Sequence, residues 1–550
     1  MTVGSPLQLG RKLPIYLRLK SLIRTGTTFL LVVLLALGLR LAGITFDSFW
    51  LDEGYQTMVD AIGQPLPDFT QVPDKPYLFK FGEPQPVRQV LEQFRSVDPL
   101  CPPLHAVLLN RWMTVFGQGD LAIRSLSVVF SLCALTAIYW FVYGIFGPRV
   151  AFFTGLIQAL SPFDIFYAQE ARMYSLLIFC ASMSFGSLLL LAHRCRQRCL
   201  QGKPPAPLAP LNLLLLFVHA LFAWGLINTH YTGLFVFLAE IAFGLWAAFS
   251  LSSWRFLFAV GGAWVTVALL WLPWFPLFQQ ASKLRRATFY VTRENGQWWW
   301  PFYAMGRVVI NWIIFLAGKK VISWWATPVY VTSAALLFTS VVASLRLRRK
   351  MLGPALPLAG VWFWLVIPPL VLLVMDVIES HRVVEIPRYI MATAPAVYVL
   401  CGLALAFLSS LSAPATAAAR WLLVAHCSFS LLSNLSSHIL PQREPWRDVA
   451  AYLEETMPAD QPLVLVAQPY DLVCLNRYLT KPIRQVGVSP VLGAQHLSSI
   501  VGKRQSFILI TAQEGESITG LVPGDFQQAQ KKDFSQGVHM RVYTKSPAAP

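Results

Sequence analysis

Residues 27–55 read TTFLLVVLLALGLRLAGITFDSFWLDEGY, an apolar run at 27–44 that is followed at once by a polar, acidic loop. A hydrocarbon core about 30 Å thick needs roughly 20 apolar residues in a helix, so 27–44 predicts a membrane-spanning helix. The run is too long for the apolar core of a signal peptide and has no convincing cleavage site, so we expect it to be retained. Asp52 and Glu53 then follow just beyond the predicted membrane boundary.

The composition of the whole chain favours a membrane protein. Of its 550 residues, 55% are hydrophobic and only 13% are charged, and the mean hydropathy is +0.54. A soluble protein of this length needs more charge to cover its surface. The net charge of +17 does not indicate a nucleic-acid partner, because the basic residues form short clusters between apolar runs, as cytoplasmic loops do. The eight cysteines are scattered and predict no disulfide framework.

The distribution of basic residues predicts the orientation of the helices. The first 25 residues carry five basic residues and no acidic one, which places the N-terminus in the cytoplasm. Segment 45–103 has nine acidic and four basic residues and is predicted to be an external loop. Basic clusters at 194–203 and 346–350 predict cytoplasmic loops. These clusters fall on the cytoplasmic side only if 104–116 is an interfacial helix and does not cross the membrane.

This scheme contains eleven spans. They are predicted at 27–44, 122–143, 150–166, 174–192, 211–227, 233–251, 256–278, 327–343, 358–375, 389–408 and 421–439. One loop does not fit the charge rule, because segment 279–320 is basic although it is placed outside. Either a boundary there is wrong or its cations meet anionic lipid headgroups.

The character of the sequence changes after residue 440. Helical periodicity covers 446–456, whereas 462–468, 506–511 and 539–544 have the pattern of strands. We therefore predict a mainly α fold, with a polytopic transmembrane domain over 1–440 that includes an external loop at 45–121. A small extracytoplasmic α/β domain is predicted over 441–550, and about a hundred residues are enough for a domain to fold by itself.

The unusual polar residues fall on the outer face of this topology. Asp52 and Glu53 lie between Trp50 and Tyr55 at the membrane boundary, where an unpaired carboxylate is costly. They are either solvated loop charges or functional groups, and we favour function. Asp98 closes the same loop and is equally compatible with both interpretations.

Three arginines, Arg124, Arg172 and Arg388, begin or border spans at the same predicted depth. Each could simply extend its guanidinium to the interface. Three at one level beside a carboxylate pair are typical of an anion site next to a base. Glu170 is more simply interpreted as a structural ion-pair partner of Arg172.

Other polar residues have weaker signals. Tyr174, His230 and Tyr231 reach the same face, although a lone histidine is more often structural. Glu240 lies midway in the sixth predicted span, too deep to join the outer site, and we expect it to form hydrogen bonds between helices.

Several short motifs occur in an order that resembles a known family of enzymes. Taken together over about 44–408, they resemble the C-type glycosyltransferases, in the bacterial branch related to protein O-mannosyltransferases and the lipid A aminoarabinose transferase. A trailing soluble domain also occurs in such proteins. The motifs are WLDE at 50–53, PPL at 102–104, FGQGDLAIR at 116–124, SPF at 161–163, YAQEARMY at 167–174, HY at 230–231 and PRY at 387–389.

This resemblance implies an inverting enzyme that uses a lipid-monophosphate sugar, with the first-loop aspartate, Asp52, as the base. It also implies that 104–116 is a loop helix, in agreement with the charge pattern. One departure concerns the position before Pro102, which is often histidine in such proteins and is Cys101 here. His105 lies nearby, and the contacts to the acceptor around this position are open.

The mechanism expected from these residues is a single displacement that inverts the anomeric carbon. Asp52 takes the proton of the attacking hydroxyl, and Glu53 orients Asp52 or a substrate hydroxyl. Arginine side chains stabilise the departing phosphate. Because they offset its charge, no cofactor is required, although Asp52 and Asp98 are hard oxygen ligands and a divalent metal is possible. The arginine candidates are Arg124, Arg172 and Arg388, with Lys283, Arg285 and Arg286 in reserve.

The expected partners are a polyprenyl-phosphate-linked sugar, membrane lipids, and a lipid, glycan or protein acceptor, with no nucleic acid. The expected location is the plasma membrane of a bacterium. The alternative function is a polytopic transporter or lipid flippase, which commonly shows inverted repeats and broken helices at mid-membrane. No internal repeat is evident here, and the polar residues gather at one face. A third alternative is a scaffold whose working part is the C-terminal domain, in which no motif indicates a role.

Overall fold

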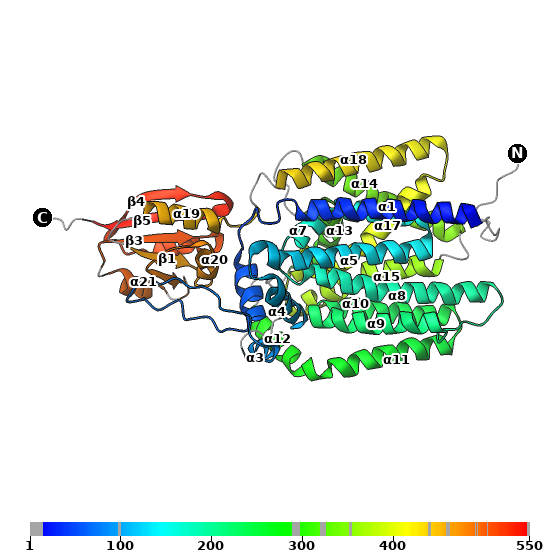
Figure 1. Cartoon of the computed structure of the whole chain (residues 1–550), viewed down its shortest axis with the longest axis horizontal. Coiled ribbons are helices and arrows are strands. Elements are labelled where there is room, and N and C mark those ends of the chain that lie inside the picture. Colours follow the sequence, from blue (N-terminus) through cyan, green and yellow to red (C-terminus); the bar gives the residue numbers. More distant parts are fainter. Residues whose placement is uncertain are drawn as a thin grey trace.

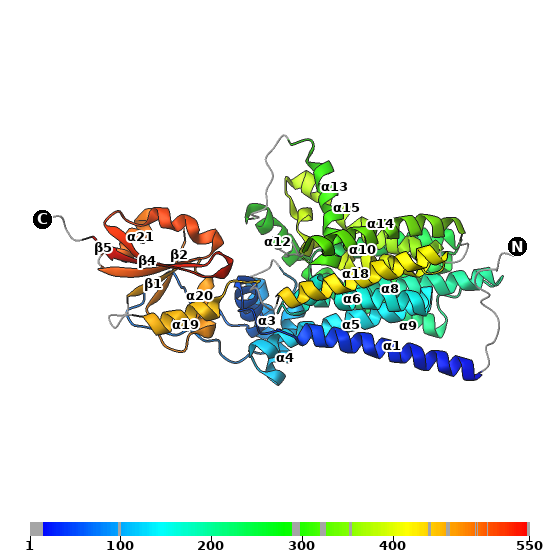
Figure 2. The same cartoon turned by 90° about the horizontal axis from the view of Figure 1, so that it is seen from above.

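The computed structural model has two parts, a helical bundle that carries the N-terminal end and a smaller sheet domain that carries the C-terminal end (Figure 1). Short helices of the segment between the first two long helices lie at the junction of the two parts (Figures 1 and 2). The structure describes residues 15–96, 101–288, 297–318, 326–350, 355–437, 442–457, 462–489, 491, 493–502 and 504–546.

Long apolar helices build the bundle, because a helix satisfies its own backbone hydrogen bonds where no water is present. Among the candidate spans, α17 (Ala394–Leu408) and α8 (Tyr174–Leu200) are the most buried, and α11 (Trp254–Trp271) and α18 (Ala413–Ser437) the least. The first two therefore form the centre and the last two the rim. The other long helices are α1 (Ile15–Leu41), α5 (Asp120–Phe146), α6 (Pro148–Leu160), α9 (Pro210–Thr229), α10 (Gly233–Ser250), α13 (Trp300–Ala317), α14 (Ala326–Lys350) and α15 (Ala355–Glu379).

The number of candidate spans agrees with the predicted fold class. Within the described residues, ten helices are long and apolar enough to cross a membrane, or eleven if α6 and α7 (Pro162–Ala168) are one bent span. The chain is therefore an integral membrane protein. The assignment differs from the prediction in two places: the apolar part of α1 counts only as a short helix, and α13 qualifies although 279–320 was predicted to be a loop.

The bend between α6 and α7 has a local cause. The two helices differ in direction by 59°. Pro162 has no N–H to continue the α6 ladder, and the Ser161 Oγ accepts a hydrogen bond from the Asp164 N–H at 3.2 Å, which caps α7. The bend directs the chain into the loop 169–173, which carries Glu170 and Arg172.

Helix α13 contacts the segment that leads to Arg388 and the bend between α6 and α7. The indole N–H of Trp300, its first residue, donates to Glu385 at 2.9 Å. At its other end, the Phe315 carbonyl accepts hydrogen bonds from Ser161 and Tyr398. These contacts support the segment that leads to Arg388, which consists of η3 (Val383–Glu385), α16 (Pro387–Ile390) and η4 (Met391–Thr393).

The segment after α1 is the external loop of the prediction. It contains a π-helix, η1 (Asp52–Val59), which is continued by α2 (Asp60–Ile62), and then α3 (Val87–Ser96) and α4 (Leu104–Phe116). Helix α4 has the predicted bounds and is not among the candidate spans, which agrees with an interfacial helix. Single π-turns are rare and occur frequently at functional sites, and this one begins at Asp52. Between α11 and α13 lie η2 (Leu272–Trp274) and α12 (Phe275–Thr288).

The C-terminal domain is a five-stranded sheet with helices on both faces. Its strand order is β2-β1-β3-β5-β4, with β1 parallel to β2 and β3, and β5 antiparallel to β3 and β4. Figure 2 shows α21 on one face and α19 and α20 on the other. The elements are α19 (Trp446–Thr456), β1 (Leu463–Ala467), α20 (Asp471–Tyr478), β2 (Gln485–Val488), α21 (Gly493–Val501), β3 (Ser506–Thr511), η6 (Gln513–Leu521), β4 (Phe526–Asp533), η7 (Ser535–Gly537) and β5 (His539–Lys545).

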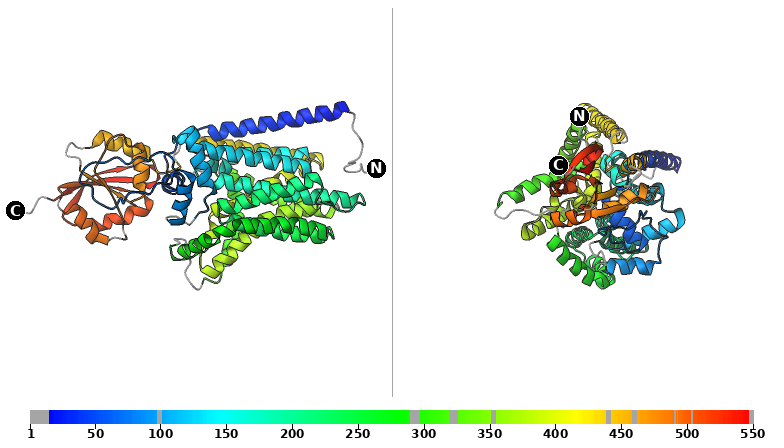
Figure 3. Two further views of the ribbon diagram at one scale, coloured as in Figure 1. Left: turned by 60° about the horizontal axis from the view of Figure 1, so that its bottom comes forward. Right: turned by 90° about the vertical axis from the view of Figure 1, so that its left-hand side faces the viewer.

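The external loop packs along this sheet domain (Figure 3). Tyr77 and Ile483 form an isolated antiparallel bridge, and the Gly487 N–H donates to the Phe69 carbonyl at 2.7 Å. The side chain of Phe69 is buried in the same hydrophobic cluster as α19 and α20. The two parts of the protein are thus joined by the loop that carries Asp52.

Candidate functional site

Asp52 is placed between two arginines that come from distant parts of the chain. Its Oδ2 atom lies 3.4 Å from the Arg388 Nη1 and 3.7 Å from the Arg172 Nη2. The Arg172 Nη1 also donates to the Asp52 carbonyl at 3.3 Å. The Asp52 side chain is 17% exposed, so a substrate group can approach it. The structure therefore brings together three of the predicted site residues as one carboxylate and two guanidinium groups.

Aromatic rings line this cluster. The guanidinium of Arg172 lies 5.6 Å from the centre of the Tyr174 ring, and that of Arg388 lies 5.4 Å from the Tyr389 ring. The His230 ring lies near both tyrosine rings, with its centre 6.4 Å from that of Tyr174 and 6.1 Å from that of Tyr389. Cation–π contacts of this kind hold a guanidinium in place without using its hydrogen-bond donors. Tyr174 and His230 thus join the cluster as predicted candidates, and Tyr389 is added to it.

The remaining predicted candidates lie elsewhere. Tyr231, in the turn before α10, packs its ring against that of Phe278 in α12, with 5.2 Å between the ring centres. Lys283 is exposed on α12. Asp98 and the side chains of Arg285 and Arg286 lie outside the residues that the structure describes.

Glu53 points away from Asp52 into a buried ion network. Its carboxylate accepts hydrogen bonds from Arg124 at 2.7 and 3.0 Å, from Arg443 at 3.1 Å and from the Ala171 N–H at 2.7 Å. Burial alone would raise the pKa of Glu53, but Arg124 and Arg443 outweigh it and hold the pKa below its usual value. Glu53 therefore holds the loop in place, and it influences Asp52 through the backbone that the two residues share.

Arg124 is fully occupied by the same network. Besides Glu53, its guanidinium donates to the carbonyls of Ile44, Asp47 and Ser48, so that all five of its N–H groups are engaged. Its side chain is only 1% exposed. This arrangement favours a structural role for Arg124 over the predicted contact with a donor phosphate.

Glu170 is a second buried carboxylate beside this network. Its Oε2 atom lies 3.8 Å from the Arg443 Nη2, and its Oε1 atom has no hydrogen-bond partner among the described residues. Burial raises the pKa of Glu170 to about 7, against the opposing effect of Arg443 and with a further contribution from Glu53. The prediction paired Glu170 with Arg172, whereas its ion-pair partner in the structure is Arg443.

His105 faces the site from α4 and is buried. Burial and the nearby Arg172 lower the pKa of His105 to about 3, so its imidazole is neutral at physiological pH. It can therefore offer a hydrogen bond but carries no charge toward a substrate.

Three groups that the sequence prediction missed are important here. The first is Arg443. A basic residue just after the last span goes against the usual charge bias if that side is external, as predicted, and this was the only signal for Arg443 in the sequence. The second is Asp120 at the start of α5, which accepts hydrogen bonds from Arg447, Arg477 and Tyr478 of the C-terminal domain. The third is the buried pair of Arg40 and Asp164.

An ion pair lies inside the bundle. Arg40 and Asp164 are both buried, with 3.5 Å between the Arg40 Nη2 and the Asp164 Oδ1, and Ser131 hydrogen-bonds to both. Charged residues within apolar runs are the sequence signal that could have identified this pair. Their mutual contacts explain how the charges are tolerated there.

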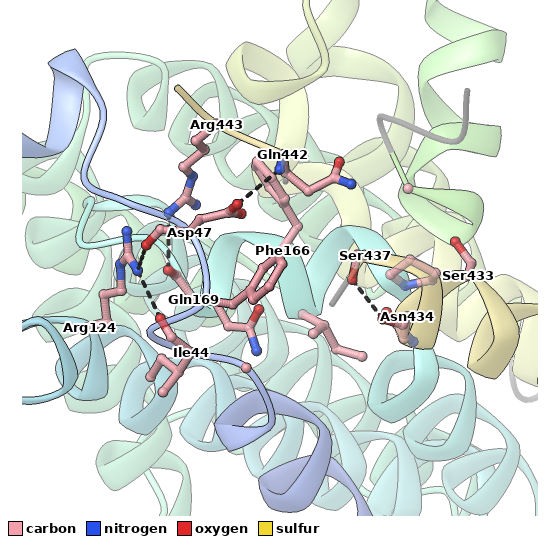
Figure 4. A pocket seen from close by; sticks show the side chains of 15 residues that line it. Ile44, Asp47, Arg124, Phe166, Gln169, Ser433, Asn434, Ser437, Gln442 and Arg443 are labelled. Atoms are coloured by element: carbon pink, nitrogen blue, oxygen red, sulfur yellow. Dashed lines mark hydrogen bonds between the residues drawn. The ribbon is translucent and has the colours of Figure 1, made fainter. Parts of the chain in front are cut away.

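A cavity of about 50 Å³ lies beside the Glu53 network, between α7, the C-terminal end of α18 and the loop that follows α1 (Figure 4). Its polar lining is engaged within the protein. The Asp47 Oδ1 accepts from the Gln442 N–H at 2.9 Å, and the Gln169 side chain donates to the Ala42 carbonyl at 2.6 Å. Within the described residues, no group of three or more His, Cys, Asp and Glu side chains has an arrangement that could hold a metal ion.

Comparison with known proteins identifies the fold. No family model matches the chain, and no curated protein matches it in sequence. ArnT from Cupriavidus metallidurans bound to undecaprenyl phosphate matches the structure with a TM-score of 0.55 at 15% identity, over 93% of this chain and 97% of that one. The archaeal oligosaccharyltransferase AglB from Archaeoglobus fulgidus, in complex with an inhibitory peptide and a dolichol-phosphate, matches with a TM-score of 0.50 at 12% identity, over 90% and 70% of the two chains. The chain therefore has the fold of the C-type glycosyltransferases, as its motifs predicted.

Proposed function

We propose that the protein is a glycosyltransferase that transfers a sugar from a polyprenyl-phosphate carrier to a hydroxyl acceptor at the extracytoplasmic face of the membrane. The observation that carries this proposal is the Asp52 carboxylate within 4 Å of Arg172 and Arg388, in a chain with this fold. The matching structures support the donor class, because one contains undecaprenyl phosphate and the other a dolichol-phosphate.

In the proposed donor site, Arg172 and Arg388 bind the phosphate. A guanidinium offers paired N–H donors that match two phosphate oxygens, and such contacts are stronger where water is excluded. Both side chains are mostly buried, with exposures of 6% and 17%. When no donor is bound, both guanidinium groups pair with the Asp52 carboxylate. A donor phosphate would take over as their partner and leave the Asp52 carboxylate available to the acceptor.

In the proposed reaction, the acceptor oxygen attacks the anomeric carbon while Asp52 takes its proton. The bond between the anomeric carbon and the phosphate oxygen breaks, and the lipid phosphate leaves with its electron pair. The two guanidinium groups stabilise the charge that gathers on this phosphate, which is commonly the largest single contribution to catalysis. They also offset its charge without a metal, so we propose that the reaction needs no cofactor.

The test is a transfer assay with purified protein, a panel of radiolabelled polyprenyl-phosphate sugars and membranes as the source of acceptor. We expect one donor to lose its label to an acceptor with release of the lipid phosphate. A transporter or flippase would instead move the intact labelled lipid between leaflets without cleaving it. Movement of intact donor with no cleavage of any panel member would contradict the proposal.

A further inference from the structure

The segment 442–447, which leads into the C-terminal domain, forms hydrogen bonds with the loop that precedes Asp52 in the sequence. The Gln442 N–H donates to the Asp47 Oδ1 at 2.9 Å, and the Arg447 N–H donates to the Ser48 Oγ at 3.0 Å. These contacts lie only a few residues before Asp52. The C-terminal domain therefore helps to set the backbone on which the proposed base is placed.

Two further contacts come from α20. The Tyr478 hydroxyl accepts a hydrogen bond from the Phe49 N–H at 2.9 Å. The Phe49 ring is enclosed between two guanidinium groups, with Arg124 at 4.6 Å and Arg477 at 4.3 Å from its centre. The loop 44–54 is thus held from the bundle side and from the C-terminal side together.

Within this arrangement, Arg443 contacts both backbone segments of the site from the side of the C-terminal domain. Its Nη1 atom lies 3.1 Å from Glu53, next to Asp52, and 3.4 Å from the Gln169 carbonyl. Its Nη2 atom lies 3.8 Å from Glu170, two residues before Arg172. The side chain is only 6% exposed, so these contacts are shielded from water. One guanidinium therefore ties the segment of the base to the segment of a phosphate ligand.

The charges give this contact its importance. Glu53 and Glu170 are both buried, and Arg443 is an ion-pair partner of each. Removing one member of a buried pair leaves an uncompensated charge, and the surrounding segments shift to relieve it. Here those segments carry Asp52 and Arg172, so the distance between base and phosphate ligand would change.

We propose that Arg443 is a positioning residue of the active site, through which the C-terminal domain fixes Asp52 relative to Arg172. This inference rests on the proposed function. It gives the C-terminal domain a part in catalysis through positioning, because the cation that Glu53 and Glu170 share, Arg443, lies outside the predicted transmembrane domain.

The test compares Arg443→Gln with a matched control, Arg447→Gln. Arg447 belongs to the same entry segment and pairs with Asp120 at 3.2 Å, but its side chain is 42% exposed. Its hydrogen bond to Ser48 comes from the backbone and survives the substitution, whereas the exposed hydrogen bonds from its side chain to the Thr45 and Phe46 carbonyls are lost. Both variants lose ion pairs between the domain and the bundle, one in Arg447→Gln and two in Arg443→Gln, and only Arg443→Gln disturbs Glu53 and Glu170.

For each variant, kcat and KM are measured with the polyprenyl-phosphate sugar that the wild type turns over, and Kd is measured for undecaprenyl phosphate. A displacement of about 1 Å can cost roughly 10²-fold in rate, so we expect Arg443→Gln to lower kcat by about that factor. Its Kd should stay within about twofold, because Arg172 and Arg388 are intact. Arg443→Lys should recover part of the loss, and Arg447→Gln should keep the wild-type kcat.

A double variant tests whether the effect passes through charge. Arg443→Gln/Glu170→Gln removes the carboxylate that the single substitution leaves without its partner. We expect it to recover up to roughly tenfold in kcat over Arg443→Gln, and we expect this recovery to grow as the pH rises, because Glu170 without Arg443 ionises only at high pH. If Arg443 served only to attach the C-terminal domain to the bundle, the second substitution would not restore kcat.

Two results would overturn the inference: a wild-type kcat for Arg443→Gln with only its thermal stability reduced, or an equal loss of kcat in Arg447→Gln. Failure of the proposed function gives a different result. In that case the wild type transfers sugar from no donor in the panel, or Asp52→Asn transfers it at the wild-type rate.

Discussion

At the scale of single residues, the proposed donor site depends on two guanidinium groups that share one carboxylate. Lysine keeps the charge but loses the paired donors, so Arg172→Lys and Arg388→Lys should weaken binding of undecaprenyl phosphate, and the alanine variants should weaken it more. A charge-assisted contact of about 1.5–3 kcal/mol corresponds to a roughly ten- to hundredfold change in Kd. Arg382→Ala is the control, because Arg382 pairs with Glu385 at the same end of the bundle and is 39% exposed. Wild-type Kd values for the alanine variants would show that these arginines do not bind the phosphate.

The buried carboxyl of Glu170 predicts a pH dependence of stability. Its pKa is raised from 4.5 to about 7 by burial. The folded protein therefore holds a proton that the unfolded chain releases between these values, so stability is fully present below about pH 4.5 and falls as the pH rises through 7. The shift corresponds to an effect on the order of 3 kcal/mol.

Glu170→Gln is neutral at every pH and should flatten this dependence. The measurement is the thermal unfolding midpoint of detergent-purified protein between pH 5 and pH 8. The wild type should lose stability across this range, and the variant should lose much less and be the more stable of the two at pH 8. An unchanged slope in the variant would mean that Glu170 is not the titrating group.

The sequence identified the residues whose signals are local. Asp52 follows an apolar run directly, and Arg172 and Arg388 border later runs, so charge at a predicted membrane boundary was enough to select them. The roles of Glu53 and Glu170 depend on Arg443, which is 390 residues from Glu53 in the chain. That contact depends on how the C-terminal domain docks on the bundle, which no local sequence pattern reveals.

At the scale of elements, the π-helix η1 is pressed against α20. A Cβ added at Gly54 would lie 2.7 Å from the Cys474 Sγ, and Cys474 is fully buried. Gly54→Ala should therefore push η1 away from α20 and lower both stability and transfer activity. Cys474→Ala removes the clashing sulfur, so the double variant should recover much of both. Thermal unfolding and transfer rates of the three variants check this, and a Gly54→Ala protein like the wild type would refute the close packing.

The elements that sequence patterns predicted are those with apolar signals. Helix α4 and helix α19 have the predicted bounds, and β1, β3 and β5 lie within or near theirs. Strand β2 was missed because it has only four residues. Strand β4 was missed because it reads FQQAQKKD, an exposed edge strand without apolar alternation. Helix α13 was taken as loop because the alternation of the neighbouring predicted spans placed segment 279–320 outside, although its basic residues did not fit that side.

At the scale of the whole molecule, the orientation in the membrane stays a prediction that rests on the basic clusters at the N-terminus, 194–203 and 346–350. If it is right, the sheet domain and Asp52 both lie outside the cytoplasm, because the loop that carries Asp52 packs on that domain. Alkaline phosphatase fused after Pro550 should then be active. An inactive reporter on a fully expressed fusion would contradict this orientation.

The fold places one carboxylate at the meeting point of the bundle, the external loop and the C-terminal domain, and the account depends on its chemistry. The most direct test measures turnover and thermal stability of Asp52→Asn on the same purified sample, with the radiolabelled donor that the wild type uses. The amide keeps the size of the side chain but cannot take a proton, so the variant should fold and bind undecaprenyl phosphate while turnover falls by roughly 10²–10⁴. Wild-type turnover in Asp52→Asn would contradict the mechanism.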